Sequence, residues 1–168
     1  MEAVLAAGPQ ATPAQNIVAR EAQLYRSSSL LLGGTRIFRH AVSSRAEVHA
    51  AILDGIPFGA LLFLLSSVKG LEESDIVNVL GISARTLRRQ RETPKKPMPA
   101  DLASKTWLFA ETLAKATEIF GGQEEAERWM NKPAMGLDGQ RPIDLLQTVQ
   151  GAELVNDFLG RLEYGVYS

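Results

Sequence analysis

The sequence of 168 residues contains no cysteine and only two histidines. The absence of cysteine excludes disulfide bonds, cysteine-ligated zinc and a cysteine nucleophile, and it is compatible with a reducing compartment. His40 and His49 stand nine positions apart, with no carboxylate or nucleophile at a spacing typical of a metal or catalytic site. We therefore expect a protein that is not an enzyme and that needs neither a metal nor another cofactor.

Long apolar runs are also missing. The most apolar stretch, 60–65, has six residues, whereas a helix needs about 20 apolar residues to span a membrane. The N-terminus lacks the basic start and the apolar segment of a secretory signal. These absences predict a cytoplasmic protein with no membrane partner.

Strand patterns and internal repeats are absent as well, since no segment alternates apolar and polar residues. Apolar residues instead recur three, four or seven positions apart, as on one face of a helix. This pattern covers 102–120 and a final helix. The expected buried face of that final helix holds Leu154, Val155, Phe158, Leu159 and Leu162. The sequence predicts an all-α fold.

Charge is unevenly distributed along the chain, although the net charge is −1. Residues 1–96 hold 12 Lys/Arg against 8 Asp/Glu, whereas 97–168 hold 6 against 11. Six of the basic residues lie in the short stretch 82–96. A basic front half indicates a polyanionic partner, and the acidic rear half indicates a different partner or none.

The run 74–91 has the pattern of two short helices that meet at Gly81. Glycine most readily takes the left-handed backbone angles that such a turn requires. Ser83 stands where a side-chain oxygen can cap the second helix. The apolar residues that would pack the two helices together are Ile76, Leu80, Ile82 and Leu87. The spacing predicts a helix-turn-helix, with a plain helical hairpin as the alternative.

Three arginines of the second helix, Arg85, Arg88 and Arg89, fall at i, i+3 and i+4, away from the packing residue of that helix. In helix-turn-helix dimers such a helix enters the major groove of operator DNA. We expect these arginines to contact guanine edges or phosphates, and Ser83 and Thr86 to contact the DNA backbone. The competing interpretation is a solvated basic face.

Prolines divide the chain, because Pro94, Pro97 and Pro99 cannot continue a helix and favour an extended connection. Residues 1–16 are rich in Ala, Pro and Gln, and we expect them to be disordered. The predicted organisation is a partly disordered region 1–44, a helix-turn-helix DNA-binding bundle 45–92, a proline-rich linker 93–99 and a second helical domain 100–168.

Three acidic residues, Glu124, Glu125 and Glu127, cluster in a short predicted helix 124–131. Negative charge in the first turn of a helix interacts favourably with the helix macrodipole. We therefore interpret this cluster as structural and not as a set of metal ligands.

Four segments of the second half stand in an order and spacing that are difficult to obtain by chance. They are 126–133 (AERWMNKP), 139–146 (GQRPIDLL), 148–152 (TVQGA) and 161–168 (RLEYGVYS). Together they resemble the toxin-binding domain of Xre/MbcA/ParS-type antitoxins, over about 100–168. The upstream helix-turn-helix is consistent with the DNA-binding region of the same proteins.

This resemblance implies an antitoxin of a bacterial type II toxin–antitoxin pair. Its usual partner is a RES-domain toxin, which removes cellular NAD⁺. The resemblance further implies that the second domain binds this toxin, and that the first domain binds operator DNA and represses the operon. We expect the DNA-binding form to be a homodimer. The alternative is a stand-alone helix-turn-helix transcription regulator whose second domain dimerises or senses a ligand.

The end of the sequence suggests how the toxin would be neutralised. Gly165 is expected to end the final helix, so that a short tail with aromatic side chains follows. Tyrosine is an effective anchor because it combines a large apolar area with a polar tip. We hypothesise that the tail enters or covers the NAD⁺ cleft of the toxin, through Tyr164, Val166, Tyr167 and Ser168. The alternative is that the tyrosines pack back onto the final helices.

Overall fold

The computed structural model describes residues 12–165 of the chain. Within this range there is no strand, and the all-α prediction is confirmed. The described part holds nine α-helices: α1 (Pro13–Leu31), α2 (Arg45–Asp54), α3 (Phe58–Ser67), α4 (Glu73–Leu80), α5 (Ala84–Arg91), α6 (Ala100–Phe120), α7 (Gln123–Met130), α8 (Pro142–Leu145) and α9 (Val149–Glu163). Two short 3₁₀ turns add η1 (Gly34–Arg36) and η2 (Met135–Leu137).

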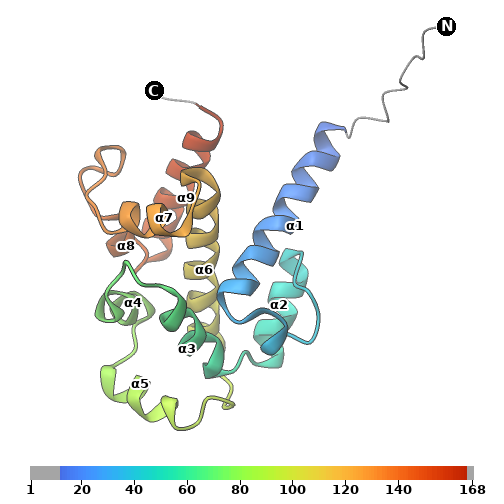
Figure 1. Cartoon of the computed structure of the whole chain (residues 1–168), viewed down its shortest axis with the longest axis vertical. Helices are drawn as coiled ribbons and strands as arrows, with labels where there is room; N and C mark the ends of the chain where they lie inside the picture. The colour runs from blue at the N-terminus through green and yellow to red at the C-terminus, as the bar shows by residue number, and fades with distance from the viewer. Residues whose placement is uncertain (1–11, 166–168) are drawn as a thin grey trace, which may run out of the picture.

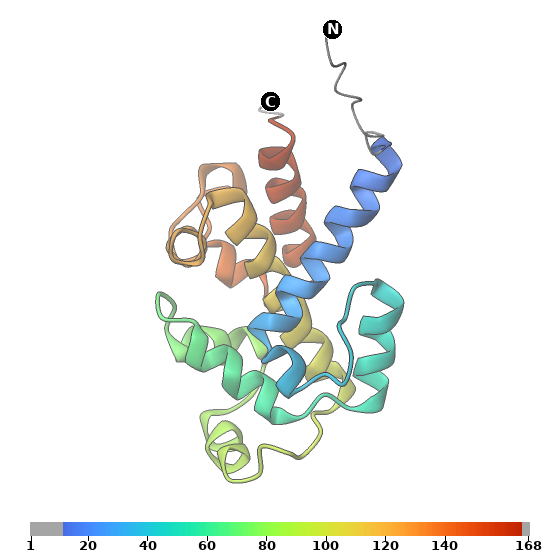
Figure 2. The same cartoon turned by 45° about the vertical axis from the view of Figure 1, so that its right-hand side comes forward.

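The longest helix, α6, runs through the middle of the molecule (Figures 1 and 2), with α1 beside it and α7 and α9 against its second half. Its predicted apolar face is buried, and so are residues outside that face, such as Ala103, Thr106 and Ala110. A helix that is buried nearly all round must be enclosed by other elements. The remaining helices therefore share one hydrophobic core around α6.

The region before α2 is more ordered than the sequence predicted. Residues 13–16, for which we expected disorder, form the first turn of α1, because Thr12 and Gln15 make a reciprocal capping box. The expectation for 1–11 lies outside the described residues. Farther along, Tyr25 and Phe38 are buried against Trp107 of α6, with ring centroids 6.5 and 5.9 Å apart.

The proline-rich segment 93–99 lies against the start of α3. Backbone N–H groups of Phe58 and Gly59 donate to the carbonyls of Lys96 and Pro94, and Met98 N–H donates to Ile56. The hydrophobic core continues across this segment, because α1 and α2 contact α6 and α4 contacts α8. Helices from both sides of the segment are thus packed together.

Glu127 is the acidic residue whose placement departs from expectation. It lies in the second turn of α7 and not the first, and it is 3% exposed. Its carboxylate accepts hydrogen bonds from the backbone N–H groups of Lys69 (3.0 Å) and Gly70, and from the side chain of Gln123. The loop between α3 and α4 is therefore held by a carboxylate of the second half. A side chain at Gly70 would collide with this carboxylate, which explains the glycine.

Arg141 makes a second polar link between the two halves. Its guanidinium forms a two-pronged ion pair with Asp144 (2.7 and 2.8 Å), and it also bonds Asp75 at the start of α4 (3.2 Å) and Asn131 (2.9 Å). These acceptors raise the pKa of Arg141 above its ordinary value, so the side chain stays charged at any working pH. The orientation of α4 is thereby tied to the loop before α8.

Removal of the Glu127 carboxylate should destabilise the protein strongly. In Glu127→Ala, buried backbone N–H groups lose their acceptor, and each such loss costs about 1–3 kcal/mol. We expect the free energy of unfolding in urea to fall by about 2–4 kcal/mol. The control is Glu125→Ala on the same helix, because Glu125 is exposed and pairs only with Arg128. Its loss should be less than about 1 kcal/mol, and equal losses in the two variants would contradict the assigned role.

A second carboxylate, Glu111 of α6, accepts a hydrogen bond from the indole N–H of Trp107 (2.9 Å). Burial raises the pKa of Glu111, and the Trp107 hydrogen bond and the charge of Arg45 offset the increase only in part. A raised pKa in the folded state favours the protonated form. The contribution of Glu111 to stability is therefore complete below the ordinary carboxyl pKa and is lost as the pH rises through the raised value.

Glu111→Gln should remove this pH dependence while its amide oxygen still accepts the Trp107 hydrogen bond. We expect the variant to gain stability relative to the wild type as the pH rises from about 4 to about 8. Urea unfolding of both proteins across this range measures the difference. A constant difference would show that folding leaves the pKa of Glu111 unchanged, and a shrinking difference would show that folding lowers it; either result contradicts the raised pKa.

Candidate functional site

The turn between α4 and α5 falls at Gly81, where the sequence predicted it, and the helix-turn-helix itself stays a prediction. Gly81 takes left-handed angles (φ 69°, ψ 28°), and its N–H donates to the carbonyl of Asn78 at the end of α4. Ile76, Leu80 and Leu87 are at most 3% exposed, so they pack the two helices onto the core. Glycine takes these left-handed angles without strain, which explains why the chain can turn at this position.

Ser83 caps α5 as expected. Its hydroxyl accepts a hydrogen bond from the backbone N–H of Thr86 (3.1 Å), and the two hydroxyls lie 2.9 Å apart. Both residues stand at the N-terminal end of α5. At this end, free backbone N–H groups and the helix dipole favour an anion such as a phosphate. Contact with DNA through these hydroxyls remains a prediction.

Arg85, Arg88 and Arg89 lie exposed on one side of α5, and with Thr86 and the acidic Glu92 they line a shallow depression. None of the three forms an ion pair with a residue of the described part of the chain. The neighbouring Arg91, in contrast, turns to α4 and pairs with Glu73 at 2.7 Å. The structure thus leaves three arginines with no acidic partner on the solvent side of α5, which forms one end of the molecule (Figure 1).

Two lysines outside α5 extend this basic face. Lys96 and Lys105 line, together with Arg89, a second depression between α5 and the first turns of α6. Lys105 pairs with Asp101 at 3.3 Å. The sequence did not indicate Lys105, because a single lysine in a predicted helix does not show which residues lie near it in space.

At the opposite end of the molecule, α9 differs from its prediction at one position. Leu154 was assigned to the buried face but is 54% exposed. The observed buried face centres on Ala152, Val155 and Leu159, with Phe158 and Leu162 half-buried beside them. Ala152, Val155 and Leu159 share the face that meets the core, and Leu154 lies on the solvent side of the same helix.

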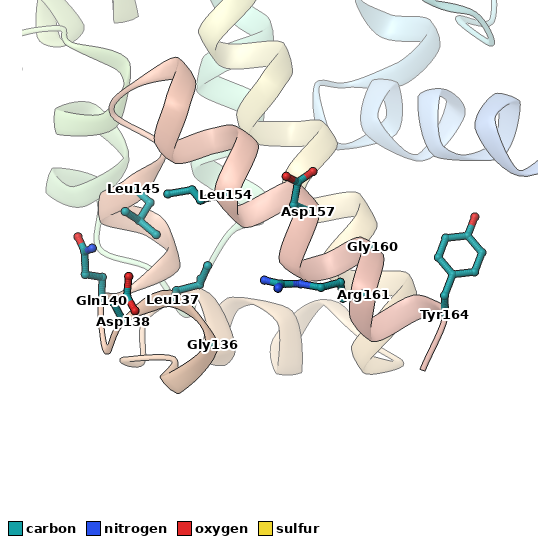
Figure 3. A pocket seen from close by; sticks show the side chains of 10 residues that line it. All are labelled: Gly136, Leu137, Asp138, Gln140, Leu145, Leu154, Asp157, Gly160, Arg161 and Tyr164. Carbon is teal, nitrogen blue, oxygen red and sulfur yellow. The ribbon is translucent and has the colours of Figure 1, made fainter. Parts of the chain in front are cut away.

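The outward side of α9 forms a groove with η2 and α8, of about 590 Å³. Figure 3 shows Leu154, Asp157, Arg161 and Tyr164 along this side of α9, opposite the segment 136–140. The spacing of these four residues, three, four and three positions, keeps them on one helical face. Leu137 and Leu145 add apolar walls, and Gly160 leaves the centre of the groove free of a side chain.

Tyr164 is the described member of the predicted tail. Its side chain is 70% exposed, so it does not pack back onto the final helices. Gly165 takes a left-handed φ of 66° directly after α9, as expected for a helix end. Val166, Tyr167 and Ser168 lie outside the described residues.

Two classes of site have no counterpart in the part of the chain that the structure describes. Among residues 12–165, no cluster of three or more His, Asp or Glu side chains could hold a metal ion. None of the helices in this range is both long enough and apolar enough to cross a membrane.

Comparison with known families finds a similarity in the second half. The family model of the antitoxin Xre/MbcA/ParS C-terminal toxin-binding domain matches residues 115–165. The matched range runs from the second half of α6 through the groove to the end of α9. Arg141, Glu127 and the residues that line the groove all lie within it.

Three curated relatives are similar over most of the chain. The antitoxin Xre of Yersinia enterocolitica is 30% identical over 138 residues, which cover 80% of this chain and 93% of the relative. The antitoxin Xre of Photorhabdus laumondii is 28% identical over 127 residues, covering 75% and 84%. The antitoxin Xre of Pseudomonas putida is 27% identical over 128 residues, covering 74% and 76%.

Proposed function

The chain belongs to the Xre family of antitoxins, and from this premise we propose that it neutralises a RES-domain, NAD⁺-degrading toxin and represses its own operon. In this proposal the protein acts by binding and not by catalysis. The toxin binds the second half of the chain, and operator DNA binds α5 of a homodimer.

The observation that carries the proposal is the separation of two unlike surfaces. The arginine face of α5 lies at one end of the molecule, and the groove beside α9 lies at the other (Figure 1). Along the chain, the basic excess lies in 1–96, which contains α5, and the acidic excess in 97–168, which contains the groove. A protein of this shape can hold a polyanion and a protein partner at the same time.

DNA binding is proposed to use α5 as the recognition helix. In a two-fold dimer, the two copies of α5 would enter successive major grooves about 34 Å apart. Arg85, Arg88 and Arg89 are available for bases and phosphates because none of them forms an ion pair within the described chain, and the three together outnumber the one carboxylate beside them, Glu92. Ser83 and Thr86 stand at the start of the helix, where the DNA backbone would pass.

Loss of the arginines should abolish specific operator binding. A base-reading arginine contributes about 1–3 kcal/mol of discrimination, so the triple variant Arg85→Ala, Arg88→Ala, Arg89→Ala should bind its promoter fragment at least 100-fold more weakly, about 2.7 kcal/mol at 25 °C. Fluorescence anisotropy at a fixed salt concentration measures this change. The matched control is Arg128→Ala, since Arg128 is an exposed arginine of α7 that pairs with Glu124 and Glu125. Unchanged promoter binding by the triple variant would refute the assignment of α5.

Toxin neutralisation is proposed to use the chain after α9. Tyr164 is exposed at the end of that helix, where a bound toxin would meet it together with Val166, Tyr167 and Ser168. In the proposed mechanism these residues enter or cover the NAD⁺ cleft and exclude the dinucleotide sterically. A cleft that binds a pyrophosphate must offer cationic or amide groups, and cationic groups also bind the faces of aromatic rings such as those of Tyr164 and Tyr167.

Deletion of 165–168 tests this mechanism. We expect the truncated protein to stay helical and to bind promoter DNA, but to leave the NAD⁺-degrading activity of the toxin largely uninhibited. NAD⁺ consumption by the purified toxin, measured with and without excess antitoxin, reports the effect. Full protection by the truncated protein would show that neutralisation lies elsewhere on the surface.

A further inference from the structure

We propose that the groove between α9, α8 and η2 is the main docking surface for the toxin, and that it receives an apolar side chain flanked by a basic one. This inference rests on the proposed function and adds that toxin binding and toxin inhibition use different parts of the chain. The groove supplies affinity, whereas the residues after α9 supply inhibition.

The first argument is the apolar surface that α9 leaves uncovered. Leu154 and Tyr164 are large side chains, 54% and 70% exposed, on the same face of one helix. Between them Gly160 has no side chain, and Leu137 and Leu145 stand on the opposite wall (Figure 3). A concave apolar surface with aromatic and aliphatic rims is typical of a site that anchors a partner side chain.

The second argument is charge. Asp138 and Asp157 line the groove, and neither forms an ion pair with a residue in the described range 12–165. The one cation of the groove, Arg161, lies over the ring of Phe158, 5.8 Å from its centroid. Two carboxylates against one guanidinium leave the groove with an excess of negative charge, and a partner with a lysine or arginine beside its apolar anchor would complement it.

Asp138 is also held in place by the backbone. It is the one residue other than glycine with a positive φ (54°) in the described part of the chain. A left-handed conformation costs an L-residue free energy, and Asp tolerates it better than most. The tight turn between η2 and α8 thus presents this carboxylate at the rim of the groove.

The third argument selects the occupant. A second copy of this chain seated on the groove in a two-fold contact would bring the four carboxylates of Asp138 and Asp157 against only two Arg161 guanidiniums, and this excess of like charge is unfavourable. The groove also lies inside the range 115–165 that matches a toxin-binding domain, at the end of the molecule away from α5. A foreign partner with basic and apolar groups, the toxin, therefore fits better than self-association.

Two pairs of matched substitutions on α9 test the proposal. Leu154→Asp places a charge in the groove, while Val149→Asp places the same charge at an exposed aliphatic residue (64%) that does not line it. Asp157→Lys reverses a charge in the groove, while Glu153→Lys reverses one on the same helix outside it. All four positions are exposed, and circular dichroism verifies that each variant is folded.

The measurement is the equilibrium affinity of full-length antitoxin for its cognate RES-domain toxin, by isothermal titration. We expect Leu154→Asp and Asp157→Lys to weaken binding at least tenfold, and both controls to stay within twofold of the wild type. The protein lacking 165–168 should keep most of its affinity, which separates binding from inhibition.

Three results would decide against the proposal in distinguishable ways. If the wild type binds the toxin and the groove variants bind as well as their controls, the docking surface lies elsewhere. If Asp157→Lys alters the oligomeric state in sedimentation analysis but not toxin affinity, the groove is a contact between copies of the chain. If the wild type itself has no affinity for the toxin, the proposed function fails and not only the assignment of the groove.

Discussion

Burial of α6 on nearly all sides is the constraint on which the rest of this structure depends. A 21-residue helix whose buried residues point in several directions, from Ala103 and Thr106 to Leu113 and Ala116, is stable only inside a shell of other helices. That requirement brings α1 to one side and α7 and α9 to the other. It also explains why segments on both sides of the proline-rich stretch share one core.

Apolar packing holds the helices together but does not define every angle between them, and polar contacts that are buried or half-buried add this definition. The Glu127 carboxylate receives the backbone N–H groups of 69–70, and Arg141 bonds Asp75 at the start of α4. Hydrogen bonds to charged groups are directional and costly to leave unmade. Since α4 leads through Gly81 into α5, these two residues of the second half help to orient the arginine face.

The separation of the two surfaces has a functional consequence. The arginine face of α5 and the groove beside α9 lie at opposite ends of the molecule (Figure 1), so the two partners proposed for them would not compete for the same surface. The two ends of the molecule are connected by α6 and by the contacts of Arg141, so the structure between them is continuously packed.

The sequence alone was sufficient for features that depend on neighbours along the chain. These include the helical class, the left-handed turn at Gly81, the Ser83 cap and the arginine face of α5, all governed by local periodicity and backbone preference. Tertiary structure decided what depends on distant residues. It exposed Leu154, because Ala152, Val155 and Leu159 share the face of α9 that meets the core, and it buried Glu127, because unpaired N–H groups 57 and 58 residues away needed an acceptor. Such placements follow from three-dimensional packing, which no local pattern encodes.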